Sequence, residues 1–274
     1  MSARGFTVLE LLIAMTITLL IAGALANLAQ PARAAFERVP AELDLQQRAR
    51  TAIDVLSQAL RSAGKDVAAT ALLGSLSDLL PTASVSEPDE SGAFTELTVI
   101  VPLTDAAQGV LSAAQSDPAG SITLAAGHCP NVKDVCGFTP GATAVIADGA
   151  GHHDVFSIAA TNAGARRVTP SAALSRSYPA GAVVVEVDQF TFGLTRQPDG
   201  SYSLIRQTAA GAIQPIVDFV SALSFDVIGR DAPAGFFRIE QVDVSIGVEP
   251  ATEALRRRIT ERVFRTSIRL RNAS

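Results

Sequence analysis

Apolar residues dominate the start of the chain and later give way to a helical stripe. Residues 11–29 are nineteen consecutive positions without a charge, close to the ~20 residues that cross a ~30 Å hydrocarbon core. One acid, Glu10, directly precedes this stretch. From Leu45 to Ala63, apolar residues recur at three- and four-residue steps, the period of a helix with one buried face. The pattern predicts a membrane-spanning helix followed by an amphipathic one.

Two prolines, Pro31 and Pro40, lie between these helical segments. A proline inside a helix removes one backbone hydrogen bond and crowds the preceding turn. We therefore expect a bend or a local break between Ala29 and Ala41. Gly64 supplies a natural helix end.

After the helices, several runs bounded by turn residues are typical of β-strands, some with apolar and polar residues alternating with a period of two and others mainly apolar. The runs are Leu97–Val101, Ala144–Ala147 with Val155–Ile158, Val183–Val187, Phe190–Leu194 with Tyr202–Leu204, Leu223–Val227, Val242–Val248 and Arg262–Leu270. They predict an antiparallel meander with one buried face, which the helical stripe would cover. The expected fold class is α+β.

Glu10 is the residue that an ordinary membrane segment would avoid, because an acid in hydrocarbon costs about 2.5–3.5 kcal/mol on insertion scales. A secretory signal peptide, with Arg4 and a cleavage site after Ala26, would account for the apolar stretch. A plain signal anchor would do so equally well. Neither alternative explains the acid.

The residues Arg4-Gly5-Phe6-Thr7-Val8-Leu9-Glu10-Leu11-Leu12 resemble the class III leader of type IV pilins and type II secretion pseudopilins. The resemblance implies that a prepilin peptidase cuts between Gly5 and Phe6 and methylates the new amino group of Phe6. Glu10 then becomes the fifth residue of the mature chain. A carboxylate in lipid needs a partner, and the Phe6 amine of a neighbouring subunit would supply it and set the axial register of a filament. Thr7, Thr16 and Thr18 can return hydroxyl bonds to their own helix.

Further segments resemble PilW-type minor pilins, among them Gln46–Gly64, Gly141–Gly149, Ile216–Val220 and Arg269–Asn272. This resemblance implies a type IV pilin-like fold, a long N-terminal helix packed on an antiparallel sheet. We expect a leader at 1–5, a transmembrane and assembly helix at 6–30, an amphipathic helix at 31–64 and a β-rich globular domain at 65–274. Within that domain, 65–140 would be a variable region and 141–274 the core sheet.

The resemblance also implies a function. The chain would be a minor pilin of type IV pilus assembly, in a filament-initiating or tip complex. Its partners would be the prepilin peptidase, other minor and major pilins, and the inner membrane, with the globular part in the periplasm. J-type pseudopilins of type II secretion and minor pilins of DNA uptake remain alternatives.

The two cysteines, Cys129 and Cys136, are separated by six residues. In an oxidising periplasm such a pair favours a disulfide. The alternative is a metal site that adds His128, His152 and His153, but this spacing matches no familiar zinc pattern. We therefore expect a disulfide and no bound metal. Glu87, Asp89 and Glu90 likewise lack the spacing of a calcium loop, so we expect an acidic solvated loop.

Charge is unevenly distributed along the 274 residues. The net charge is −5, yet residues 254–274 contain seven Arg and only one acid. Such asymmetry can indicate an anionic partner. However, Arg262, Arg265, Arg269 and Arg271 alternate with Phe264, Ile268 and Leu270, which is typical of a solvated sheet face. We expect no nucleic-acid partner.

Motifs for catalysis are absent from the sequence. It contains no Gly-rich phosphate loop after a strand, no Gly-x-Ser-x-Gly elbow and no His-Glu-x-x-His helix. Its three histidines offer few acid or base candidates. We expect neither enzymatic activity nor a cofactor. A membrane-anchored enzyme or metal-binding protein is the remote alternative.

Overall fold

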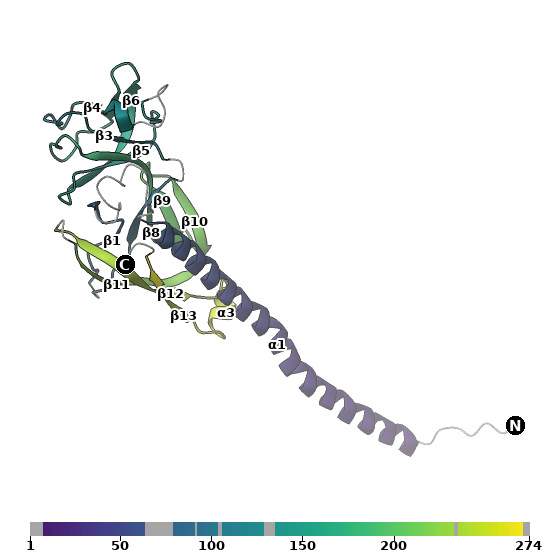
Figure 1. Cartoon of the computed structure of the whole chain (residues 1–274). Helices are drawn as coiled ribbons and strands as arrows, with labels where there is room; N and C mark the ends of the chain where they lie inside the picture. Colours follow the sequence, from purple (N-terminus) through teal and green to yellow (C-terminus); the bar gives the residue numbers. More distant parts are fainter. Residues whose placement is uncertain are drawn as a thin grey trace. The chain divides into compact units, whose positions relative to one another are not determined.

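The computed structural model describes residues 8–63, 79–90, 92–103, 106–128, 135–232 and 235–270. Gly5, Phe6, Gly64 and Cys129 therefore lie outside the described residues. The helices are α1 (Val8–Ser62), η2 (Ala126–His128, a 3₁₀ turn) and α3 (Glu253–Arg256). The strands are β1 (Ala83–Val85), β2 (Leu97–Pro102), β3 (Gln108–Val110), β4 (Ile122–Thr123), β5 (Thr143–Ala147), β6 (His153–Asn162), β7 (Arg167–Pro170), β8 (Val183–Arg196), β9 (Tyr202–Thr208), β10 (Ile213–Asp218), β11 (Val220–Asp231), β12 (Phe237–Val248) and β13 (Arg262–Arg269). An N-terminal apolar helix followed by a largely antiparallel sheet domain confirms the α+β, pilin-like fold class (Figure 1).

The chain divides into two compact units. One contains the chain up to Gln47 together with Pro250–Thr260, and the other contains Arg48–Glu249 and the chain from Glu261 onward. Helix α1 contributes residues to both. All the strands belong to the second unit.

Helix α1 is unbroken over 55 residues, including Pro31 and Pro40. The predicted local break between Ala29 and Ala41 is therefore wrong. A proline removes only one hydrogen bond from the ladder, and the bonds on either side keep the helix continuous. Arg38 and Glu42 add an ion pair of 2.9 Å one turn apart, next to Pro40.

The later part of α1 carries the predicted apolar stripe. Its buried members are at most 1% exposed, and they are Leu45, Ala49, Ala52, Leu56, Leu60 and Ala63. Ile53 is only half-buried, because it lies at the edge of the stripe. Within the second unit, α1 runs beside the end of β13, where Gln58 and Arg61 line a groove together with Leu270.

Within the described residues, the strands form two sheets rather than the single predicted meander. The larger sheet has ten strands and is organised by the long strand β8. Strands β2 and β3 pair with one edge of β8, and β5 and β9 pair with the other. The predicted hairpins are confirmed, with Val145 opposite Val155 and Leu194 opposite Leu204. Two strands from the 65–140 segment thus pair directly with β8.

Strand β5 and the first half of β8 are buried on both faces, which corrects the expectation of one buried face. Ala144, Ile146 and Val184 join a core on one face, and Val145 and Val185 join a core on the other. Strands covered on both sides read as continuous apolar runs rather than as alternation. This explains the runs Ala144–Ala147 and Val183–Val187.

The smaller sheet has the order β11-β12-β13 and one buried face. Its inner side chains include Phe225, Val242, Val244 and Ile246, none more than 1% exposed. On the outer face, the register aligns one side chain from each of β11, β12 and β13 in a row that runs across the strands. Gly229 occupies a bulge of β11, where an added Cβ would clash with the backbone of Arg238.

Candidate functional site: the N-terminal helix

The first part of α1 is an exposed apolar helix. Val8–Asn27 is a 20-residue segment long and apolar enough to cross a membrane. Every large apolar side chain from Val8 to Leu25 is at least 50% exposed. Twenty helical residues span about 30 Å, the thickness of a hydrocarbon core. An apolar surface of this size requires lipid or other helices around it.

Glu10 lies in the first turn of this helix. A carboxylate in the first turn interacts favourably with the helix dipole and with the backbone N–H groups at that end. This position reduces the cost of the acid but leaves it at the end of an apolar surface. The sequence predicted this placement, and the structure shows Glu10 exposed beside Leu9 and Leu11.

Two threonines follow Glu10 within the apolar segment. Thr16 donates its hydroxyl to the carbonyl of Ile13 at 2.8 Å, and Thr18 donates to Ala14 at 2.7 Å. Both hydroxyls are thereby satisfied inside the helix, as predicted. Thr7 lies outside the described residues, as do the proposed cleavage residues Gly5 and Phe6.

Of the two cysteines, Cys136 lies in a buried core and is 1% exposed, whereas Cys129 is outside the described residues. The disulfide thus stays a prediction. Of the histidines considered for a metal site, His152 contacts an acid of its own loop, with Nδ1 2.8 Å from Asp148 Oδ2. Asp154, which follows His153 in the chain, accepts from the Tyr178 hydroxyl at 2.9 Å. Among the described residues, no group of three or more His, Cys, Asp or Glu side chains could hold a metal.

Tyr178 is a buried phenol that the sequence did not indicate. It is 1% exposed, and burial, followed by its hydrogen bond to Asp154, raises its pKa well above the ordinary value. The backbone N–H of Ser175 also donates to Asp154, at 2.9 Å. The network ties the loop before β8 to β6 and supports the fold.

The arginines near the end of the chain are engaged within it. Arg256 Nε donates to the carbonyl of Pro250 at 2.9 Å, and Arg257 pairs with Glu253 at 2.6 Å. On β13, Arg265 and Arg269 are exposed on the outer face, as predicted. Arg262 is an exception, because it is two residues from Phe264 and therefore lies on the same face of β13 as Phe264, not on that of Arg265. Arg271 lies outside the described residues.

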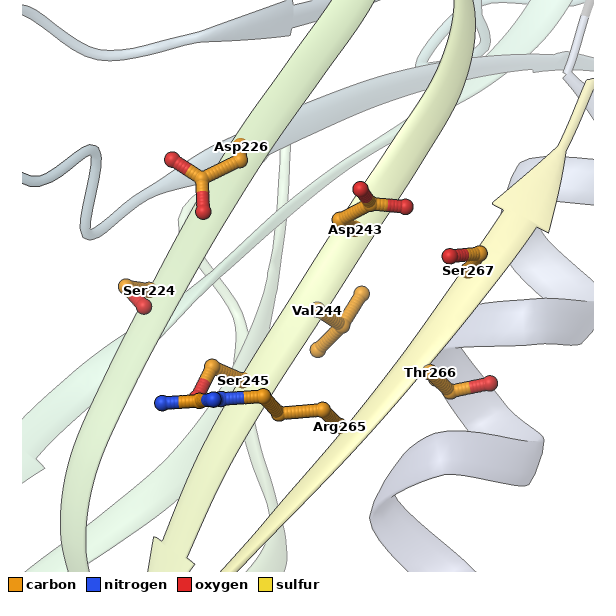
Figure 2. Close-up of a pocket in the computed structure, with 8 residues that line it drawn as sticks. All are labelled: Ser224, Asp226, Asp243, Val244, Ser245, Arg265, Thr266 and Ser267. Carbon is orange, nitrogen blue, oxygen red and sulfur yellow. The ribbon is translucent and has the colours of Figure 1, made fainter.

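The outer face of β11-β12-β13 carries a shallow polar depression of about 510 Å³ (Figure 2). Asp226 and Asp243 are directly opposite across the strands, and Ser224, Ser245 and Arg265 occupy the next row. Ser267 and Gln241 donate hydrogen bonds to Asp243 and lower its pKa. Ser224 and Asp226 alternate with Leu223 and Phe225 in the sequence, which predicts that the two polar residues share one face of the strand. That Asp226 lies opposite Asp243 follows only from the strand register. Like charges directly opposite destabilise a sheet, and the donors beside Asp243 offset that cost.

Residues 1–26 match the family model described as the prokaryotic N-terminal methylation motif. No curated protein matches the chain. The matched residues include Glu10 and most of the exposed apolar segment of α1. The chain therefore carries a prepilin-type N-terminal motif, which implies processing by a prepilin peptidase, on the apolar helix of a type IV pilin-like α+β protein.

Proposed function

We propose that the chain is a minor pilin, most similar to the PilW type, that takes part in type IV pilus assembly within a filament-initiating or tip complex. One observation carries the proposal: the methylation motif of residues 1–26 continues into a helix whose apolar side chains are exposed from Val8 to Leu25. A secretory signal would be cut away together with such a helix. A prepilin-type cut keeps the helix in the mature protein.

In this proposal the helix first anchors the chain in the inner membrane and then exchanges lipid for the helices of other pilins. Cleavage between Gly5 and Phe6 frees an amino group, which methylation leaves cationic. Glu10 of one subunit then pairs with the Phe6 amine of its neighbour. Because the cost of a carboxylate in hydrocarbon is relieved by an opposite charge, assembly is favoured only in the axial register that brings these two groups together.

The proposed role is structural rather than enzymatic. The histidines could have served as bases, yet His152 is exposed and held by Asp148, an arrangement that stabilises the loop between β5 and β6. Replacing His128, His152 and His153 together should therefore leave assembly intact. Loss of assembly in a triple variant that still folds would support a catalytic or metal-binding role instead.

The test of this function is deletion of the chain followed by complementation. A minor pilin predicts loss of surface fibres on deletion and recovery of the chain itself in sheared fibres on complementation. Loss of export of folded proteins, with normal fibres, would assign the chain to type II secretion. Normal fibres with lost DNA uptake would assign it to a competence system, and both results would contradict the proposal.

A further inference from the structure

The ten-stranded sheet has a notch beside β8, and its lining residues lie between Thr143 and Ala209 rather than on α1. Strand β5 pairs with Val183–Glu186 of β8, and β9 pairs with Phe190–Arg196. Backbone groups of successive β8 residues point to opposite edges, so Glu186 and Gln189, three residues apart, face different edges. Glu186 N donates to the Ala107 carbonyl beside β3, whereas the Gln189 carbonyl accepts from Ala209 N beside β9. Strands β5 and β9 thus pair with the same edge of β8, one after the other. A gap separates them along the stretch of β8 formed by residues 187–189.

The notch encloses about 350 Å³, within the range of about 300–1,000 Å³ typical of small-molecule sites. Val155 supplies its apolar wall, whereas the side chain of Phe156, which also borders the notch, belongs to the core on the other face of the sheet. No charged side chain lines it among the described residues. Its polar lining consists of neutral amides and hydroxyls only, from Thr143, Ser157, Gln189, Thr191, Gln207 and Thr208.

These polar groups are half-buried, and most are available to a ligand. Thr191 shares a hydrogen bond of 2.9 Å with Thr98, and Thr208 accepts from Ala212 N at 3.2 Å. Within the described parts of the chain, the side chains of Thr143, Ser157, Gln189 and Gln207 make no hydrogen bond. Four neutral groups that can donate and accept therefore converge on one small cavity.

We propose that this notch binds a single neutral sugar residue, such as one unit of a surface glycan. Each sugar hydroxyl can both donate and accept a hydrogen bond. Amides and hydroxyls can do the same, whereas a charged group only donates or only accepts. The C–H face of the ring would lie on the wall formed by Val155. Phosphates and carboxylates are disfavoured because the lining holds no cation. An extended peptide would need a longer free edge than the three residues 187–189.

The test is saturation-transfer NMR on the detergent-solubilised full chain with glucose, galactose and N-acetylgalactosamine as probes, and with glucuronic acid as the charged comparison. We expect saturation transfer to at least one neutral sugar and weaker transfer to glucuronic acid. Gln189→Leu keeps the side-chain size but removes the amide, and we expect binding about tenfold weaker. Thr143→Val, inside the notch, should also weaken binding.

The matched control is Thr195→Val. It removes a threonine hydroxyl from a part of β8 that lies outside the notch, so this variant should bind like the unmodified chain. Circular dichroism of each variant separates lost binding from lost folding. The proposal is overturned if no neutral sugar binds at tens of millimolar, or if Gln189→Leu binds as well as Thr195→Val. Binding of an unstructured Ser/Thr-rich peptide without any sugar binding would overturn it in favour of strand addition.

Discussion

The guanidinium carbon of Arg48 lies 5.7 Å from the centre of the Phe219 ring, and Arg48 also donates to the Asp218 carbonyl at 3.1 Å. Phe219 has a φ of 58°, a left-handed conformation that is strained for a bulky residue. It is the single residue between β10 of the larger sheet and β11 of the smaller one. Helix α1 thus contacts the chain where it passes from one sheet to the other.

This contact predicts that Arg48→Ala destabilises the second unit by about 1–2 kcal/mol, through loss of a charged hydrogen bond and a cation–π contact. Chemical denaturation followed by circular dichroism measures the change. Arg48→Lys should recover part of the loss, because an ammonium retains the charge but not the planar stacking. An Arg48→Ala variant as stable as the unmodified chain would show that the contact does not support the junction.

A second prediction concerns acid stability. Hydrogen bonds from Ser267 and Gln241, the latter at 2.9 Å, lower the pKa of Asp243 in the folded chain. The stabilisation is therefore present above the ordinary pKa and is lost as the pH falls through the folded-state value. Ser267→Ala should raise the pKa of Asp243 in a carboxyl NMR titration. Thr266→Val, the neighbour on the other face, should leave that pKa unchanged; equal effects would rule out the proposed hydrogen bond as the cause.

The predicted Cys129–Cys136 disulfide can be tested by intact mass. Protein purified without reductant should be lighter by about two hydrogens than the reduced form. In the chain-entropy model, so short a loop contributes roughly 2.5 kcal/mol, so reduction should lower the free energy of unfolding by about that amount. Two free thiols that react with a maleimide in the unfolded, unreduced protein would contradict the prediction.

Glu10 is the residue predicted to control assembly. Glu10→Ala removes the carboxylate from the first turn of α1 and should make membrane insertion easier, since the apolar segment becomes fully uncharged. Incorporation into fibres should nevertheless fall strongly, measured by immunoblot of sheared fibres against the membrane fraction. Glu10→Asp keeps the charge and should retain part of the incorporation. Unchanged incorporation of the Ala variant would end the register argument.

Helix α1 and most strands could be predicted from the sequence because their signals are local, whereas the short helices η2 and α3 were not predicted. The stripe from Leu45 to Ala63 has the helical period, and the strand carrying Val242, Val244 and Ile246 alternates with period two. The continuity of α1 across Pro31 was missed, because a local rule for proline does not count the hydrogen bonds on either side. The chain passes from the larger sheet to the smaller one at Phe219, whose left-handed conformation the sequence does not indicate.

In the candidate site too, the features that depend on local sequence could be predicted and those that depend on strand pairing could not. Glu10, Thr16 and Thr18 were placed correctly because they lie on one helix with known geometry. The notch beside Gln189 was not foreseen, since it brings together two hairpins, β5–β6 and β8–β9, that are distant from each other in sequence. The opposed acids Asp226 and Asp243 likewise depend on strand register, which alternation alone cannot specify.

The most direct test of the account is the N-terminal mass of the protein extracted from membranes. A prepilin-type motif predicts a mature chain that begins at Phe6, with one methyl group on its amine and with Glu10 as its fifth residue. An N-terminus at residue 27, after a cut behind Ala26, would show that the apolar helix is a signal that is removed. An unprocessed N-terminus at Met1 would reduce the helix to a plain anchor, and either result would contradict the proposed assembly role.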